Sequence, residues 1–490
     1  MPVGHFCGSK GANVLKMQIQ KQVTAWMQEH REEIVRDIFR LVRIPSISNL
    51  GSGVEPFGQP CRDVLDEMLQ IGREQGFHTK NYEYRCGALW LEGTEEDAEN
   101  SIGFWGHLDV VPPGNNWEYP PFEPFEKDGW LIGRGVEDNK GSTVAVLYLI
   151  RCLQELGITG KYPLRLFVGC DEERGMEDVT WFAKNHPCPK ISIVVDSSFP
   201  VCYGEKGIIE TTLKAAEPFS EEVISMQGGL ASNIVPDVAE ICVRRSERVQ
   251  NALTLLPKEL EVVEEEEFLR ITARGKAGHT AFPEGSVNAI ERLIKGVLYA
   301  ELLPDADAEK LFFMAQAAQD CYGRGLHITC KDELSGDLTC VGSMCGMDDS
   351  RRPWLHFNIR YPITADAGWL EEQIRNAGAA WGFAPEQLEV NGPNYFPKEN
   401  PAVEILSRAY ADITGDNTEP FVIGGGTYAR KLPRAFAYGP GFPGEEKNPP
   451  MVQPGHGGAH GPDEALSLES LFRAAEIIAV GIAGLEEADW

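Results

Sequence analysis

Hydrophobic residues in the first 200 positions follow two patterns, helical spacing and short buried runs. Apolar residues three and four positions apart predict amphipathic helices, and short unbroken apolar runs predict strands buried on both faces. The predicted helices cover residues 16–43, 61–76, 141–157 and 180–185, and the predicted strands cover 88–91, 101–105, 164–169 and 191–195. Strands and helices that alternate in this way are typical of an α/β sheet with helices on its faces.

The pattern changes near Tyr203. From about residue 207 to residue 380, apolar and polar residues alternate in short stretches, which predicts antiparallel strands. Two segments with helical spacing, 287–303 and 369–379, lie between these strands, and the acidic run Glu264–Glu267 is interpreted as a solvated turn. This part of the chain is expected to form a separate α+β insertion.

The α/β pattern returns after Pro393, with predicted helices at 401–414 and 467–485. We therefore expect an α/β fold in which one discontinuous domain, with a mixed sheet and helices on both faces, is interrupted by an inserted α+β domain. The expected boundaries are 1–205 and 386–490 for the two parts of the larger domain and 206–385 for the insertion.

The composition restricts the class of protein. The 490 residues include 45 Lys and Arg against 74 Asp and Glu, a formal net charge of −29. Nucleic acids and anionic membrane surfaces both attract basic segments, so neither partner is expected. The chain has no apolar stretch of about 18 residues, no secretory signal pattern, and twelve cysteines without CxxC pairs. We expect a cytoplasmic protein with free thiols.

Polar residues that can bind metal ions follow the predicted strands or precede predicted helices, where α/β proteins place their sites. In chain order they are His107 and Asp109 (GHLDVVP), Asp138 (GRGVEDNKG), Glu172 and Glu173 (GCDEERG), Asp196 (VVDSS), and His456 and His460 (GHGGAHGPDE). Taken one at a time, each motif also has an ordinary explanation as a helix cap, an exposed turn or an exposed loop.

Taken together, these residues have the composition of a two-metal centre. Two zinc ions about 3.5–4 Å apart need a bridging carboxylate and further His and carboxylate ligands. The set divides into Asp138 as the bridge, His107 and Asp196 on one ion, and Glu173 and His460 on the other. Glu172 is then left over as the general base.

The same motifs, in the same order, resemble those of the M20 family of metal-dependent peptidases, and within it the PepV-like (Sapep) dipeptidases. The resemblance extends over nearly the whole chain. Further matching segments are SNIVP (232–236), GHT (278–280), NIRY (358–361), GGGTYAR (424–430) and FPG (442–444). It implies that the larger domain is a zinc-peptidase catalytic domain and that the insertion is its lid.

The resemblance also implies roles for individual residues. His107, Asp138, Glu173, Asp196 and His460 match metal ligands for two Zn²⁺, with Mn²⁺ or Co²⁺ able to replace zinc, and His460 is preferred over His456. Asp109 matches the carboxylate that orients the histidine, and Glu172 matches the general base. A cis peptide bond is implied between Asp138 and Asn139.

Substrate-contacting residues are implied for the insertion and for the glycine-rich segment. His279 matches the donor to the developing oxyanion. Asn233 and Arg360 match positions that contact the substrate backbone and its C-terminal carboxylate, which suits the planar fork of an arginine. Gly425 and Thr427 belong to a segment whose backbone can approach the substrate closely.

The function expected from this is a dipeptidase that hydrolyses unblocked dipeptides, including Xaa-His types such as carnosine, through a water activated by two zinc ions and Glu172. The alternative is an N-acyl amino-acid deacylase of the acetylornithine or succinyl-diaminopimelate type. A third class, a non-catalytic metal-binding protein, is disfavoured because a structural zinc site needs no leftover base. The insertion is about twice as long as the dimerising lid of short relatives, so we expect a monomer whose own lid supplies His279.

Overall fold

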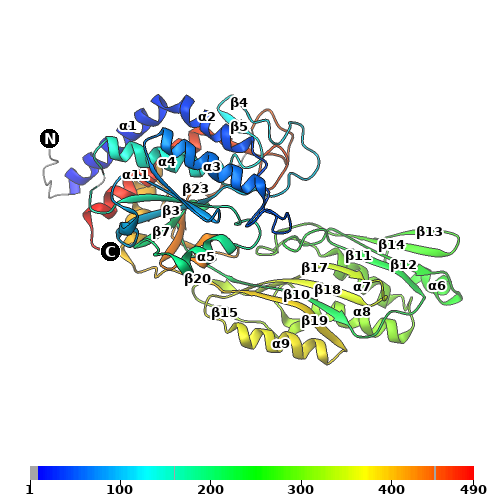
Figure 1. The fold of residues 1–490 in the computed structure, drawn as a ribbon. Coiled ribbons are helices and arrows are strands. Elements are labelled where there is room, and N and C mark those ends of the chain that lie inside the picture. Colours follow the sequence, from blue (N-terminus) through cyan, green and yellow to red (C-terminus); the bar gives the residue numbers. More distant parts are fainter. Residues whose placement is uncertain (1–8, 159, 446–448) are drawn as a thin grey trace. The chain divides into compact units, whose positions relative to one another are not determined.

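The structure, a computed structural model, describes residues 9–158, 160–445 and 449–490. The chain folds into two compact units (Figure 1). Unit 1 contains the described residues up to Gly204 together with Asn394–Phe421 and Gly426–Trp490, and unit 2 contains Glu205–Pro393 and Val422–Gly425. The chain therefore leaves unit 1, forms most of unit 2, returns to unit 1, and adds one further short segment to unit 2.

Unit 1 is built around a mixed β-sheet. Its strands are β1 (His78–Tyr82), β2 (Cys86–Trp90), β3 (Ile102–His107), β6 (Leu164–Gly169), β7 (Ile191–Val194), β9 (Val201–Glu205), β20 (Asn394–Tyr395) and β22 (Ala435–Tyr438). The strand order is β1-β2-β6-β3-β7-β22-β9-β20. Neighbours among β6, β3, β7 and β22 run parallel, and the pairs β1–β2, β2–β6 and β22–β9 are antiparallel.

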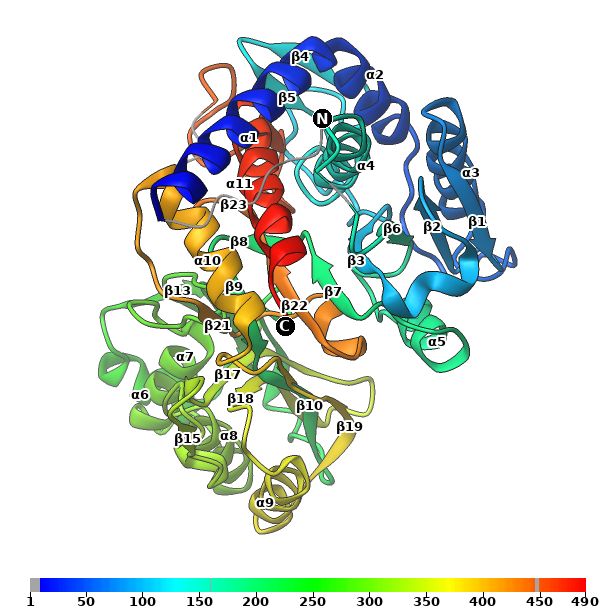
Figure 2. The same cartoon turned by 90° about the vertical axis from the view of Figure 1, so that its left-hand side faces the viewer.

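Helices and short strands complete unit 1. The helices are α1 (Ser9–Glu29), α2 (Arg31–Val42), α3 (Gln59–Glu74), α4 (Lys140–Glu155), α5 (Glu177–Asn185), α10 (Pro401–Thr414) and α11 (Leu468–Glu487), with 3-10 turns η1 (Glu95–Asn100) and η4 (Tyr428–Lys431). The short strands are β4 (Phe125–Lys127), β5 (Trp130–Ile132), β8 (Ser197–Ser198), β23 (Pro440–Gly441) and β24 (Ala465–Ser467). Helix α11 packs against α1, α4 and α10 (Figure 2).

Helices cover both faces of the unit 1 sheet at β3. Trp105 makes an edge contact with Phe182 of α5, whereas a side chain at the next residue, Gly106, would meet Thr143 of α4. Successive residues of a strand point to opposite faces, so these two contacts lie on opposite sides of the sheet. All six residues of β3 are buried for this reason, which explains its unbroken apolar sequence.

The single helix predicted over residues 16–43 is instead two helices, α1 and α2, separated at His30. His30 has φ −96° and ψ 10°, outside the helical region, and its ring stacks on Trp26 with 3.8 Å between centroids. A one-residue interruption hardly changes the spacing of apolar positions on either side. The pattern alone therefore could not reveal it.

Unit 2 is built on an antiparallel sheet with the strand order β13-β14-β12-β11-β17-β18-β10-β19. These strands are β10 (Gly207–Ala215), β11 (Val223–Gly228), β12 (Val238–Arg244), β13 (Leu260–Glu264), β14 (Phe268–Arg274), β17 (Thr339–Met347), β18 (Pro353–Tyr361) and β19 (Phe383–Asn391). The helices are α6 (Glu247–Ala252), α7 (Ala289–Tyr299), α8 (Asp305–Ala317) and α9 (Ala367–Ala379), with η2 (Leu253–Leu255) and η3 (Arg324–Leu326). The short strands β15 (Lys331–Asp332) and β16 (Gly336–Asp337) pair with each other, and β21 (Phe421–Ile423) pairs with β9.

The helices of unit 2 cover one face of its sheet, with α7 against β12 and β14 and α9 against β19. Burial alternates along all nine residues of β10, as expected for a sheet with one covered face. Strand β18 departs from this alternation. Phe357 and Ile359 point into the apolar core of unit 2, but Asn358 and Arg360, which point to the opposite face, are buried as well.

The predicted α/β class, with a mixed sheet, helices on both faces and an inserted α+β unit, is confirmed. The acidic residues Glu265–Glu267 connect β13 and β14 as an exposed turn. Within the described ranges, no helix is both long enough and apolar enough to cross a lipid bilayer.

Candidate metal centre

The candidate ligands of unit 1 are brought together by parallel strands. β3 ends at His107, β6 ends two residues before Asp171, and β7 ends two residues before Asp196. Because the carboxyl ends of parallel neighbours meet at one edge of the sheet, these segments converge there. Close packing also requires Gly106, since a Cβ at this position would lie 2.3 Å from Thr143 Oγ1 and 2.7 Å from Asn139 Oδ1.

His107 is fully buried, and its ring is held in one orientation. Nδ1 donates to the carbonyl oxygen of Asp109 at 3.0 Å, which leaves Nε2 facing Asp138 Oδ1 at 2.9 Å. Asp196 Oδ2 lies 3.6 Å from the same Nε2. A histidine fixed in this way through Nδ1 is the usual arrangement for a metal ligand that binds through Nε2.

Asp138 lies between two histidines. Its Oδ1 contacts His107 Nε2, and its Oδ2 lies 3.1 Å from His460 Nε2. His460 Nε2 also lies 3.0 Å from Glu173 Oε2. The two oxygens of one carboxylate thus face two separate sets of donor atoms, as in a carboxylate that bridges two cations. The peptide bond between Asp138 and Asn139 is cis, as the resemblance implied.

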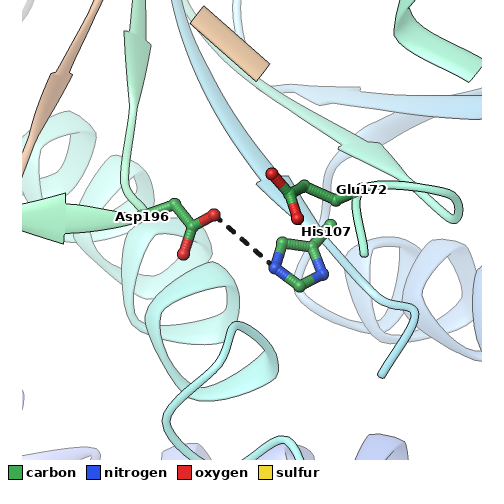
Figure 3. Close-up of side chains that lie close together, drawn as sticks. All are labelled: His107, Glu172 and Asp196. Atoms are coloured by element: carbon green, nitrogen blue, oxygen red, sulfur yellow. Dashed lines mark ion pairs between the residues drawn. The ribbon is translucent and has the colours of Figure 1, made fainter. Parts of the chain in front are cut away.

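Glu172 lies on the His107 side of the cluster. Figure 3 shows the carboxylates of Glu172 and Asp196 gathered with the ring of His107, each on a different segment of the chain. One ligand atom from each of these three residues lies within 4.8 Å of the others. The same holds for His107, Asp138 and Glu173. The geometry therefore allows Glu172 to act either as a ligand or as a base.

Asp109 connects the histidine to the two glutamates. Its carboxylate accepts hydrogen bonds from the backbone N–H of Glu172 at 3.2 Å and of Glu173 at 3.1 Å, and its Oδ1 lies 3.4 Å from His107 Nδ1. The direct acceptor of the histidine proton is the Asp109 backbone carbonyl. The buried Asp109 carboxylate mainly fixes the segment that carries Glu172 and Glu173.

Burial and hydrogen bonds shift the pKa values of the residues in the cluster. Hydrogen bonds with Asp138 and Glu173 raise the pKa of His460 to about 10. Burial raises the pKa of Asp196 to about 7 and that of Glu172 well above its usual range. Burial lowers the pKa of His107, but hydrogen bonds with Asp109 and Asp138 outweigh it and hold that pKa well above the usual value. Like charges in a buried site demand cations, either protons or metal ions.

The residues present fit divalent cations. The donors are imidazole nitrogens and carboxylate oxygens, the set that zinc prefers alongside thiolates. Ligand atoms of a tetrahedral zinc with bonds of about 2.0–2.1 Å are about 3.3 Å apart. Nε2 of His107 and of His460 lie 2.9–3.6 Å from their carboxylate partners Asp138, Asp196 and Glu173, which brackets this spacing.

The second histidine of the late loop has a different environment. His456 Nδ1 lies 2.5 Å from Asp463 Oδ2, and Asp463 also accepts hydrogen bonds from the backbone N–H groups of Glu118 and Tyr119. His456 therefore belongs to a structural contact between two loops. Of the two histidines, His460 is the one that faces Asp138 and Glu173.

Two buried residues that the sequence did not single out support the cluster. Asp178 accepts hydrogen bonds from the N–H groups of Cys170 and Asp171, directly before the glutamates, and from the hydroxyl of Tyr428. Burial raises the pKa of Asp178 to about 7. Tyr428 lies in the glycine-rich segment and its ring is 6.3 Å from that of His107. An Asp at the start of an ordinary helix gives no sequence signal for this role.

The candidate oxyanion donor, His279, is exposed on unit 2. The segment around it pairs with the segment around Asn233: Thr280 N–H donates to the Asn233 carbonyl at 3.0 Å, and Ile234 bridges to His279. The N–H of Ala281 donates to His279 Nδ1 at 3.1 Å. Because Nδ1 accepts, the neutral ring carries its proton on Nε2, which is then a donor.

Arg360 is buried on β18 with its guanidinium held from two sides. Nε donates to Asn358 Oδ1 at 2.8 Å, and Nη1 donates to the carbonyl of Gly424 at 3.1 Å. Asn358 Oδ1 also accepts from the hydroxyl of Thr280 at 2.9 Å. Asn358 thus connects Arg360 to the residue after His279, a link that the sequence did not indicate.

Gly425 and Thr427 have different local roles. Thr427 is buried and caps η4, with its Oγ1 accepting from the N–H of Ala429. A Cβ at Gly425 would meet only Ile423, at 3.7 Å, whereas one at Gly424 would lie 2.6 Å from the Ala281 Cβ. The steric need for glycine is therefore stronger at Gly424 than at Gly425.

Comparison with known proteins agrees with the motifs. The family model described as "Peptidase family M20/M25/M40" matches residues 103–482. A protein of Bacillus subtilis (strain 168) named "Putative dipeptidase YtjP" is 30% identical over 474 residues, which cover 92% of this chain and 97% of that protein.

Two solved structures share the fold. The di-peptidase Dug1p from Saccharomyces cerevisiae has a TM-score of 0.56 at 14% identity, covering 96% of this chain and 99% of that chain. Human carnosine dipeptidase 1 has a TM-score of 0.53 at 14% identity, covering 96% and 100%. The family match spans most of the chain, and the chain therefore belongs to peptidase family M20/M25/M40.

Proposed function

We propose that this chain is a metal-dependent dipeptidase that hydrolyses the peptide bond of unblocked dipeptides. The observation that carries the proposal is the position of Asp138, whose two oxygens lie 2.9 and 3.1 Å from Nε2 of two different histidines. The dipeptidase names of the Bacillus subtilis relative and of the two similar structures support the substrate class. Dipeptides of the Xaa-His type, such as carnosine, are included.

The proposed cofactor is a pair of Zn²⁺ ions, with Mn²⁺ or Co²⁺ able to replace them. One ion would be held by His107, Asp196 and Asp138, and the other by Asp138, Glu173 and His460. When bound, such ions polarise the scissile carbonyl and lower the pKa of water.

Glu172 is proposed as the general base. Its carboxyl is buried, which raises its pKa, and it lies beside His107 and Asp196, where a carboxylate can accept a proton from a water molecule. It accepts the proton of the attacking water and delivers it to the amine that leaves. Asp109 positions Glu172 through the backbone N–H and orients His107.

Residues of unit 2 are proposed to bind the substrate. His279, with its proton on Nε2, donates to the oxygen that becomes negative in the transition state, an interaction worth on the order of 3 kcal/mol. Arg360 binds the C-terminal carboxylate and Asn233 the backbone, with Gly425 and Thr427 bordering the substrate. Unit 2 is thus proposed to be a lid, and the active form to be a monomer that uses its own His279.

The test is a substrate profile with defined metal content. Purified chain is stripped with chelator and reloaded with Zn²⁺, Mn²⁺ or Co²⁺, and each form is assayed against free dipeptides, carnosine and the N-acetylated forms of the same dipeptides. We expect chelator-sensitive cleavage of the free dipeptides. Preference for the N-acetylated forms would favour a deacylase instead, and absence of chelator-sensitive cleavage would overturn the proposal.

A further inference from the structure

Glu464 makes four hydrogen bonds although it contacts no candidate ligand side chain. Its Oε1 accepts from the backbone N–H of Glu137 at 2.9 Å and of Asp138 at 3.0 Å. Its Oε2 accepts from the N–H of Gly135 at 2.9 Å and from Arg134 Nη1 at 2.6 Å. The Glu464 side chain is fully buried, so these four donors replace water completely.

Arg134 extends this contact to the other end of the cluster. It is buried, and its Nη2 donates to the backbone carbonyl of His460 at 3.2 Å. Its guanidinium also lies over the Trp117 ring at 5.1 Å. The Arg134–Glu464 pair therefore connects the segment that carries Asp138 with the loop that carries His460, which lie 322 positions apart in the sequence.

We propose that Glu464 and Arg134 form a positioning pair that sets the separation of Asp138 and His460 and thereby tunes the affinity of the cation site that these residues share. The inference rests on the proposed function, because it assumes that Asp138 and His460 bind cations. It extends that function by giving a role to the Glu of the late HGPDE motif, which binds no metal and touches no substrate in the proposal above.

Glu464 can be tested by substitution because an amide at this position would not match the four hydrogen-bond donors around it. The carboxylate offers acceptors on both oxygens, and each oxygen receives two donors. In Glu464→Gln, one end of the side chain becomes an NH₂ group that opposes two N–H donors, so the segment before Asp138 must shift. Substituting a residue that orients a metal ligand through a hydrogen bond typically lowers metal affinity by about 10–100-fold.

The experiment compares Glu464→Gln with the wild type and with Asp37→Asn as a matched control. Asp37 is also a fully buried carboxylate of unit 1, and its side chain bonds to Arg36 and Arg40 on its own helix and to Tyr148 in the middle of α4. Calorimetry measures the affinity for Mn²⁺ and for Zn²⁺. Electronic spectra of the Co²⁺ forms report the coordination geometry, which a purely structural defect elsewhere leaves unchanged.

We expect Mn²⁺ and Zn²⁺ affinity to fall about 10–100-fold in Glu464→Gln, with an altered Co²⁺ spectrum, and to remain at the wild-type value in Asp37→Asn. Arg134→Lys keeps the charge, but lysine cannot bond both Glu464 and the His460 carbonyl, so we expect an intermediate loss of metal affinity. This variant also tests the proposal if Glu464→Gln does not fold. Wild-type affinity in folded Glu464→Gln or Arg134→Lys would overturn the positioning role while leaving the dipeptidase proposal intact. A wild type that binds no cation would overturn both.

Discussion

The two units hold their candidate residues by different means. In unit 1, His107 and Asp196 lie at or just after the ends of parallel strands, and the buried carboxylate of Asp109 fixes Glu172 and Glu173 by accepting their backbone hydrogen bonds. In unit 2, His279 is exposed on a loop and Arg360 lies on an antiparallel strand, and the neutral Asn358 connects them through Thr280. Unit 1 concentrates negative charge and is suited to cations, whereas unit 2 offers donors suited to an anionic or polar substrate.

This difference predicts a separation of effects. Substitutions in unit 1 should change cation binding or the chemical step, and substitutions in unit 2 should change catalysis or substrate affinity without changing cation affinity. Each measurement below has an outcome that would contradict this difference between unit 1 and unit 2 substitutions.

The largest effect is expected for Glu172→Gln. It removes the proposed base, so kcat should fall on the order of 10³-fold while the bound metal content remains at the wild-type value. The comparison variant is Glu173→Gln, which should lower metal affinity instead, because Glu173 contacts His460 at 3.0 Å. Loss of metal in Glu172→Gln would assign Glu172 as a ligand, the other role that its position near His107 and Asp196 allows.

His279→Ala should lower kcat about 10²–10³-fold and leave metal affinity unchanged, because it removes one donor to the transition state. The ring is exposed and accepts a hydrogen bond from the N–H of Ala281, so folding should be preserved. Mixing the purified His279→Ala and Glu172→Gln proteins tests whether the histidine at each active site comes from the same chain or from a partner chain. No recovery of activity is expected if each chain uses its own His279; recovery would indicate that a partner chain supplies it.

Many helices and strands of unit 1 could be predicted because they follow from the spacing of apolar residues along one segment. The strand Leu164–Gly169 and the helix Pro401–Thr414 have the predicted bounds. The positions of the strand ends were enough to predict that the acidic motifs lie at one edge of the sheet. Helix α8 was missed because a buried Asp307 and an exposed Phe312 obscure the apolar pattern of the face that holds Leu311 and Met314.

The supporting contacts of the cluster were not predictable in the same way. The backbone N–H of Asp138 donates to the side-chain carboxylate of Glu464, which is distant in the sequence, and the sequence gives only an Asp-Glu pair after a proline. Arg360 and Asn358 look like the outward residues of an ordinary strand, and only the burial of both side chains distinguishes them. Such contacts depend on how distant segments meet, which spacing along one segment does not record.

A smaller effect is expected for Arg360→Lys. Lysine keeps the charge but loses the planar fork that bonds Asn358 and Gly424 together, so KM for dipeptides should rise about 10-fold with little change in kcat. The matched control is Arg375→Lys on α9, whose side chain is 55% exposed and whose Nη2 lies 3.9 Å from Glu371 Oε2. An equal rise of KM in both variants would show that the effect comes from the fold of unit 2 and not from Arg360.

The smallest and most gradual effect concerns pH. In the metal-free protein the pKa of His460 is raised from 6.5 to about 10, so its stabilising contribution is complete below pH 6.5 and is lost as the pH rises toward 10. The pKa of Asp196 is raised from 3.8 to about 7, so the metal-free fold also loses stability as the pH rises from about 3.8 to about 7, where the folded state must give up this proton. A cation replaces these protons, and the rise in Tm on adding Zn²⁺ or Mn²⁺ should therefore grow between about pH 5.5 and pH 8.5, equally in the wild type and in His279→Ala. A rise in Tm that does not depend on pH would show that the cation binds away from His460 and Asp196, and the contrast between the two units would then lose its electrostatic basis.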